Sequence, residues 1–162
     1  MGGRTGAAAA VSAARISLRP ARDADRPAIT AIERASFSDA WPDSSFLELL
    51  SQQPAMLWVA ESGGRVVGYW VGRRIGDEAE LQNIAVHPDW RGHGIGRALL
   101  EDFIAAVCGD VETVIFLEVR ASNHGAIRLY ESLGFEELDR RRGYYSRPVE
   151  DAVVMIRPAG RG

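Results

Sequence analysis

The sequence predicts an α/β fold in which a mixed, mostly antiparallel sheet is flanked by about four helices. Strand-like runs alternate with segments of helical apolar spacing along the 162 residues, a length typical of one compact domain. In addition, a nearly continuous β-branched and aromatic run at 113–119 follows an amphipathic segment at 96–108. This order favours a βαβ unit with a parallel strand pair.

The first part of the chain is expected to contain one strand and two helices. A short strand begins at Ile16, and residues 23–37 then place Ile29 and Ile32 at helical spacing. Residues 44–52 predict a second, shorter helix with an apolar stripe.

A hairpin and a further strand follow these helices. Residues 56–61 and 66–75 are both strand-like and flank a Gly-Gly turn, which is a hairpin pattern. Gly76 and Asp77 then turn the chain into a strand over 78–86.

The C-terminal part is expected to alternate strand and helix. The run at 113–119 has the composition of a strand covered on both faces. A helix from about Asn123 ends at Gly134, and two strands around 135–138 and 151–156 follow it.

The composition limits the classes of function. The net charge of −3 argues against a protein that binds nucleic acid across its surface. The one cysteine, Cys108, excludes an intrachain disulfide and fits a reducing cytoplasm. The histidines show no metal-ligand spacing, so no metal site is expected; they are His87, His93 and His124.

The ends of the chain differ from its middle in composition. Residues 1–14 are small and lack the Leu/Ile/Val run of a signal peptide. We expect a disordered tail over 1–14, one domain over 15–158 and a flexible C-terminus over 159–162. No stretch approaches the roughly 20 apolar residues that span a bilayer. The sequence favours a cytoplasmic monomer with no membrane partner.

The segment 83–100 is the most informative part of the chain. A strand ends there, and a loop runs directly into a helix, with three glycines at alternate positions, Gly92, Gly94 and Gly96. Such a loop lets backbone N–H groups converge beside a helix N-terminus, which favours phosphate binding. Arg91 and Arg97 could add charge. The alternative is a plain turn, but the sequence lacks the GKS, GKT and GxGxxG patterns of other phosphate loops.

Two further residues are candidates for proton transfer. Glu118 lies within an apolar strand, where a carboxylate must be paired, face a cavity or have a raised pKa. It is either a base or a carboxylate paired with Arg120 or another arginine. Tyr130 follows on the next helix as either a core tyrosine or a proton donor to a leaving thiolate.

Several motifs in order resemble one enzyme family. The loop RGHGIG matches the R/Q-x-x-G-x-G/A signature of the GNAT acetyltransferase superfamily, and residues 117–135 match its following strand and helix. The resemblance spans about residues 15–157, and ERASFSDAW, RRGYY and EDAVVM narrow it to the RimI-like branch. It implies a sheet that splays apart at its centre to hold acetyl-CoA.

The resemblance also implies which residues bind the cofactor. Backbone groups of the 84–86 segment would line the pantetheine arm, where an N–H could polarise the thioester carbonyl. The glycine loop would cradle the pyrophosphate, and Asn123 would lie near the thiol. The implied residues are Ile84, Ala85, Val86, Arg91, Gly92, His93, Gly94, Ile95, Gly96, Arg97 and Asn123.

The catalytic roles are carried over in the same way. In RimI-like enzymes the residues at the positions of Glu118 and Tyr130 are the proton acceptor and the proton donor. Other branches place the base at about the position of Glu80, which we rank second as a base and expect to guide substrate. The expected substrate-binding residues are Trp41, Glu80, Tyr144 and Tyr145.

The reaction implied by the resemblance is transfer of acetyl from acetyl-CoA to the α-amine of a protein N-terminus. The favoured acceptor is the N-terminal alanine of a small-subunit ribosomal protein. Two alternatives remain: a small-molecule or lysine N-acetyltransferase, and a non-catalytic acetyl-CoA-binding module. The connection between RRGYY and EDAVVM is shorter than in the better-known RimI sequences, which leaves peptide specificity open.

Overall fold

The computed structural model describes residues 15–52, 55–109 and 112–160. In chain order its elements are β1 (Ser17–Pro20), η1 (Asp23–Asp25), α2 (Arg26–Ser36), α3 (Asp43–Ser51), β2 (Leu57–Ser62), β3 (Arg65–Ile75), β4 (Glu78–Val86), η2 (Pro88–Trp90), α4 (Ile95–Cys108), β5 (Val114–Arg120), α5 (His124–Ser132), β6 (Glu136–Ser146) and β7 (Val149–Arg157).

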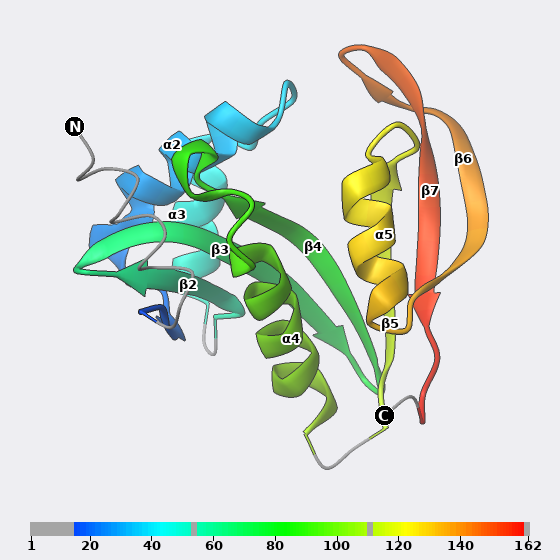
Figure 1. Ribbon diagram of the computed structural model, residues 1–162, viewed down its shortest axis with the longest axis horizontal. Helices are drawn as coiled ribbons and strands as arrows, with labels where there is room; N and C mark the ends of the chain where they lie inside the picture. The colour runs from blue at the N-terminus through cyan, green and yellow to red at the C-terminus, as the bar shows by residue number, and fades with distance from the viewer. Residues whose placement is uncertain (1–14, 53–54, 110–111, 161–162) are drawn as a thin grey trace. The chain divides into compact units, whose positions relative to one another are not determined.

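The strands follow the order β1-β2-β3-β4-β5-β7-β6 in one seven-stranded sheet (Figure 1). Strands β4 and β5 run parallel, whereas the pairs β1–β2, β2–β3, β5–β7 and β6–β7 are antiparallel. The predicted fold class, a mixed and mostly antiparallel sheet with helices, is confirmed, and the described residues form four α-helices.

Contacts group the described residues into two compact units. The first contains residues 15–71 and 83–102, and the second contains residues 72–82 and the described residues from 103 onward. The elements β3, β4 and α4 each have residues in both units.

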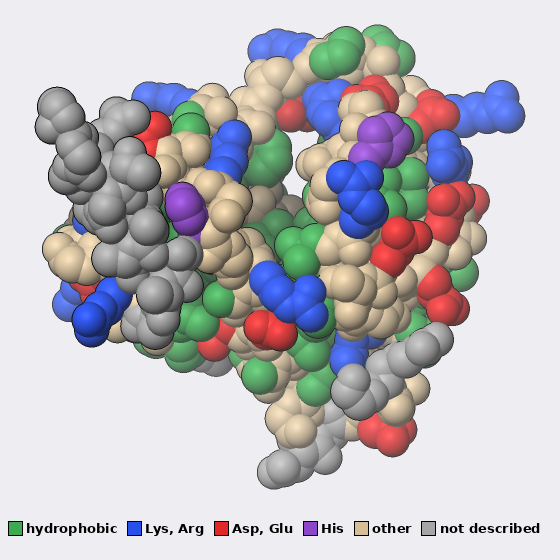
Figure 2. All heavy atoms as spheres, in the orientation of Figure 1, with side chains coloured by type: hydrophobic (Ala, Val, Ile, Leu, Met, Phe, Trp, Pro, Cys, Tyr) green, Lys and Arg blue, Asp and Glu red, His purple; other side chains and the backbone are tan. Residues whose placement is uncertain are grey.

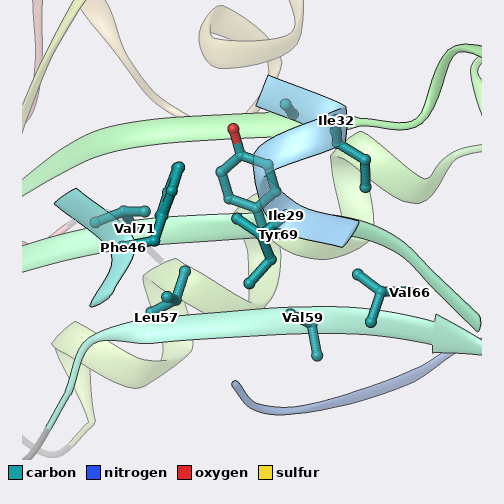
Figure 3. Close-up of a cluster of buried hydrophobic side chains, with 9 residues drawn as sticks. Ile29, Ile32, Phe46, Leu57, Val59, Val66, Tyr69 and Val71 are labelled. Carbon is teal, nitrogen blue, oxygen red and sulfur yellow. The ribbon is translucent and has the colours of Figure 1, made fainter. Parts of the chain in front are cut away.

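The core of the first unit is a cluster of apolar side chains from two helices and three strands. Ile29 and Ile32 from α2 are fully or almost fully buried, as are Phe46 from α3 and Val59 from β2 (Figure 3). The two isoleucines are three residues apart, so they lie on one face of the helix. The helical spacing read from the sequence therefore identified the buried face of α2.

A buried carboxylate joins four segments of this unit. Glu33 on α2 is only 1% exposed. It accepts hydrogen bonds from the Tyr69 hydroxyl on β3, from Asn83 Nδ2 on β4 at 2.6 Å and from the Trp41 backbone N–H at 2.9 Å. The Tyr69 hydroxyl oxygen points away from the apolar cluster (Figure 3). Burial raises the pKa of Glu33 above its usual value despite these three donors.

The second unit is built on the parallel pair predicted from the βαβ pattern. Residues Glu78–Leu81 of β4 pair with Val114–Leu117 of β5, and the remaining residues of both strands lie beyond the last pair of this ladder. Helix α5 follows β5, and β7 pairs antiparallel with both β5 and β6. In Figure 2 acidic and basic side chains are interspersed over α5 and the C-terminal strands.

Strand β5 differs from its prediction in how its two faces are covered. Ile115, Leu117 and Val119 are buried, but the residues between them are only half-buried. Two of these, Phe116 and Glu118, line a cavity. The expected cover on both faces is therefore complete on one face and partial on the other, which borders this cavity.

The expected tail over 1–14 and the last two residues of the expected C-terminal segment, 161 and 162, lie outside the described residues. Within the part of the chain that the structure describes, no helix is long and apolar enough to cross a membrane.

Replacing Glu33 by Gln should lower the free energy of unfolding by about 1–3 kcal/mol, because an amide nitrogen would then face hydrogen-bond donors. The penalty should be largest at acidic pH and shrink toward neutral pH. Since the folded-state pKa is raised, the folded parent keeps its proton longer than the unfolded chain and loses stability as pH rises through that interval, whereas the variant does not.

Urea unfolding of both proteins from acidic to neutral pH would measure this difference. Glu48→Gln, at an exposed position on α3, is the control and should change stability by no more than about 0.5 kcal/mol. A penalty for Glu33→Gln that grows with pH contradicts the prediction.

Candidate acetyl-transfer site

The glycine loop lies between β4 and α4 in the first unit. Gly92 and Gly94 both have φ of +81°, a conformation that side-chain-bearing residues rarely adopt. The Gly94 carbonyl accepts the N–H of Ala98 at 3.1 Å, so Gly94 immediately precedes the first turn of α4. A helix directs the N–H groups of its first turn outward along its axis, which here is toward the loop. The local backbone therefore has the form of an anion-binding site.

The two arginines of this loop are both engaged by protein groups. Arg91 donates from Nε to the Val86 carbonyl at 3.0 Å and from Nη2 to the Ser36 hydroxyl at 2.9 Å. Arg97 pairs with Glu101 one turn along α4 at 3.6 Å. Arg91 thus fastens the loop to the end of β4. Its guanidinium contacts show a positioning role that the sequence prediction did not include.

The segment Ile84–Val86 is the end of β4. The Ile84 N–H donates to the Asn83 side-chain oxygen at 3.2 Å, while Ala85 is buried. The Ala85 carbonyl lies close to Gly68 on β3, where an added Cβ would be 3.0 Å from that oxygen and 2.9 Å from Leu99 Cδ1. Gly68 therefore permits a close approach of β3, β4 and α4 within the first unit.

Asn123 caps α5 in the second unit. Its Oδ1 accepts the Ala126 N–H at 3.3 Å, which satisfies one of the free donors at the helix start. The residue predicted to lie near the cofactor thiol therefore has a structural partner of its own.

The second unit contains a charged cavity of about 290 Å³. Three carboxylates and two guanidinium groups border it together with apolar side chains. The lining residues are Arg73, Ile75, Glu78, Ala79, Glu80, Phe116, Leu117, Glu118, Arg141 and Val154. Two of the candidate residues, Glu80 and Glu118, are thus brought to one cavity, and the carboxylates outnumber the guanidinium groups.

Glu118 is half-buried at this cavity. Its Oε2 lies 3.3 Å from Arg141 Nε, and its Oε1 lies 3.5 Å from the Tyr144 hydroxyl. Oε2 is fully buried, yet among the described residues no group donates a hydrogen bond to it. The contact with Arg141 is therefore an ion pair without the alignment of a hydrogen bond. The pairing with an arginine that the sequence left open is observed with Arg141, and Arg120 pairs with Glu150 instead.

Tyr130 is a core residue of the second unit. It is 6% exposed, and its ring packs against Phe135 with a centroid distance of 5.8 Å. Burial raises the pKa of the Tyr130 phenol well above its usual value, which keeps the proton on its oxygen at neutral pH. The side chains that line the charged cavity include Glu118 but not Tyr130.

The expected substrate-binding residues fall into different settings. Glu80 lines the cavity and pairs with Arg73 at 3.3 Å. Tyr144 is about half exposed, and its ring lies edge-on to that of Tyr145 at 5.1 Å. Trp41 belongs to the first unit, where its ring packs against Phe46 and its backbone N–H donates to the Glu33 carboxylate.

The structure adds two cations that the sequence prediction did not single out, Arg73 and Arg141. Arg73 lies in the predicted strand 66–75, and Arg141 lies in the motif RRGYY. Neither pattern could identify them, because facing the cavity depends on which strands become neighbours. Among the described residues no group of His, Cys, Asp and Glu has the arrangement of a metal site.

Comparison with known proteins decides the family. Residues 26–135 match the Acetyltransferase (GNAT) family. The ribosomal protein bS18-alanine N-acetyltransferase of Escherichia coli (strain K12) is 38% identical over 136 residues, which are 83% of this chain and 91% of that protein. This chain belongs to the GNAT acetyltransferase family.

Solved GNAT structures agree with this assignment. The crystal structure of the Escherichia coli ribosomal-protein-S18-alanine N-acetyltransferase has a TM-score of 0.80 and 37% identity, and the match covers 88% of this chain and 93% of that one. A chain of the NatC complex bound to Gag peptide and CoA has a TM-score of 0.78 and 25% identity, with 89% and 98% covered. The predicted resemblance to GNAT N-acetyltransferases is confirmed, and the chain is an enzyme of this class.

In this GNAT chain, Gly94→Ala should weaken coenzyme A binding about five- to thirtyfold. No heavy atom lies within 4 Å of the added Cβ, so the effect comes from the positive φ. A side chain disfavours that conformation by about 1–2 kcal/mol, which pulls the loop N–H groups out of position. Isothermal titration calorimetry with coenzyme A measures the loss.

Gly64→Ala is the matched control. Gly64 has a φ of +78° and equally open surroundings, but it lies in the turn between β2 and β3. Both variants should lose similar thermal stability, and only Gly94→Ala should lose affinity. Equal affinity losses would show that the loop has no special part in binding.

Proposed function

We propose that this enzyme transfers acetyl from acetyl-CoA to the α-amine of a protein N-terminus, and that its principal acceptor is the N-terminal alanine of a small-subunit ribosomal protein. The observation that carries the proposal is Glu118, whose buried Oε2 faces a charged cavity and receives no hydrogen bond from the described residues. The 38% identity to an alanine N-acetyltransferase over most of both chains supports the same acceptor.

The residues of the glycine loop fit the phosphate part of acetyl-CoA. A pyrophosphate needs converging N–H donors and space for its oxygens. Gly92 and Gly94 leave that space open, and the first turn of α4 supplies the donors. The Ile84–Val86 backbone and Asn123 would contact the pantetheine arm. Acetyl-CoA supplies the activated acetyl group as a thioester.

Glu118 would act as the general base. The amine nitrogen must be neutral to attack the carbonyl carbon, and Glu118 would accept its proton, directly or through one water. Glu80, held by Arg73, would guide the acceptor rather than take the proton. The new C–N bond forms as the C–S bond breaks, so no covalent enzyme intermediate is needed.

Tyr130 would protonate the departing thiolate and recover its proton from solvent. Its raised pKa holds the phenol in the protonated form until the thiolate appears. The same shift makes the phenol a weaker acid, so protonation by solvent is the competing route. A Tyr130→Phe variant measures how much of the reaction uses that route.

An α-amine is the acceptor that such a base can serve most easily. With a pKa of about 8, roughly a tenth of it is neutral at pH 7, whereas a lysine with a pKa near 10.4 has only a few neutral molecules in ten thousand. Tyr144, beside Glu118, would flank the peptide, with Tyr145 and Trp41 as further contacts. The enzyme would work as a cytoplasmic monomer with its catalytic domain over 15–158 and no metal.

The proposal predicts a specific pattern of turnover. Coenzyme A release should be fastest with an Ala-initiated peptide of the ribosomal protein, slower with internal-lysine peptides, and slowest with spermidine. Glu118→Gln should lower kcat by about 10²–10⁴, the usual contribution of a general base, whereas Glu80→Gln should mainly raise KM. Tyr130→Phe should lower kcat without raising KM.

Two results would change the assignment. Preference for spermidine or for lysine peptides would favour the small-molecule or lysine acetyltransferase. Binding of acetyl-CoA with no turnover of any amine would favour a non-catalytic module.

A further inference from the structure

Strand β6 carries a large bulge opposite β7. Arg141 pairs with Ala152 and Tyr145 pairs with Glu150, so the three residues 142–144 of β6 stand opposite the single residue 151 of β7. The bulge is held by Gly143, whose φ is +59° and whose N–H donates to the Asp151 carboxylate at 3.0 Å. Bulges of this kind redirect side chains and are frequent beside active sites.

The bulge brings two side chains to the same carboxylate. Residues three apart on a regular strand face opposite sides of a sheet. Here Arg141 and Tyr144 both contact Glu118, one through Nε at 3.3 Å and the other through its hydroxyl at 3.5 Å. The Arg141 guanidinium also lies 5.6 Å from the centre of the Tyr144 ring. The local backbone is thus shaped to present a cation to the proposed base.

The contact between Arg141 and Glu118 is built to be weak. Arg141 is 59% exposed, and the buried Oε2 beside it still receives no hydrogen bond from the described residues. Exposed ion pairs contribute little because water and salt screen them. Arg120, on β5, shows the opposite construction: it pairs with Glu150 at 20% and 18% exposure and also donates to the carbonyls of Arg147 and Pro148.

We propose that Arg141 is an internal competitor of the acceptor amine, and that only an acceptor that arrives as a cation displaces it from Glu118. The inference rests on the proposed function, in which Glu118 receives an ammonium group. A terminal ammonium is small and has three N–H donors, so it can supply the hydrogen bond that Oε2 lacks. Its arrival releases Arg141 to solvent, and the exchange of one cation for another keeps the charge of the cavity constant.

Neutral ligands do not bring about this exchange. A ligand without positive charge would leave Glu118 uncompensated when it displaces Arg141, which costs more than the contacts it gains. A cationic amine replaces the charge of Arg141, so its only cost is the loss of the weak Arg141–Glu118 ion pair. Arg141 thus raises the KM of the cationic acceptor slightly, whereas an uncharged ligand leaves the Arg141–Glu118 pair in place and does not bind more tightly when Arg141 is removed.

The test uses the full chain and two short Ala-initiated peptides, one with a free α-amine and the other with that amine acetylated. Calorimetric titration with coenzyme A present should show that Arg141→Gln binds the free-amine peptide about two- to fivefold more tightly than the parent, the factor that an exposed ion pair contributes. Affinity for the acetylated peptide should not show this gain. In turnover, KM for the free-amine peptide should fall by the same factor while kcat changes less than about twofold.

Arg140→Gln is the matched control. Arg140 is the preceding residue of β6 and is 53% exposed, but its partner is Glu137, outside the cavity. It should leave both affinities at the parent values. Thermal melting of each variant checks that folding is intact.

Three results overturn the inference. If Arg141→Gln binds the free-amine peptide no more tightly than the parent, Arg141 does not compete with the amine. Equal gains for both peptides show that charge exchange is not involved. An equal gain from Arg73→Gln shows a general charge effect of the cavity. The proposed function fails separately, by absence of turnover of every amine by the parent.

Discussion

A carboxylate removed from water must receive hydrogen bonds or a counter-charge from the protein, and two glutamates of this chain meet this constraint in opposite ways. Glu33 is enclosed and accepts donors from Tyr69, Asn83 and the Trp41 backbone. Glu118 keeps a buried oxygen without a hydrogen bond from the described residues and faces a cavity. The first arrangement fixes structure, and the second leaves a hydrogen-bond acceptor available at the cavity.

The satisfied carboxylate explains why the first unit can present an ordered backbone. Glu33 holds Asn83, whose side-chain oxygen in turn accepts the Ile84 N–H at the start of the proposed pantetheine segment. Arg91 then ties the following loop to the Val86 carbonyl. A phosphate-binding loop made of backbone N–H groups depends on such supports, because a shift of the main chain moves every donor at once.

The charged cavity of the second unit is suited to a cationic amine. Three carboxylates and two arginines leave the cavity with an excess of negative charge. One of the arginines, Arg141, is exposed and loosely paired, whereas Arg120 is locked into the β6–β7 hairpin. Arginine therefore has two roles here: Arg120, which is more buried and makes more hydrogen bonds, holds structure, whereas the exposed Arg141 forms a weak pair.

The sequence by itself determined the succession of strands and helices along the chain, the parallel pair and the family, because periodicity, glycine spacing and motif order are local properties of the chain. It also singled out Gly92, Gly94 and Glu118 as candidate site residues. Only the tertiary structure decided that Arg141 rather than Arg120 pairs with Glu118, and that one face of β5 borders a cavity. Both outcomes depend on strand neighbours and on the β6 bulge. A bulge of this size breaks the two-residue alternation on which any reading of a strand relies.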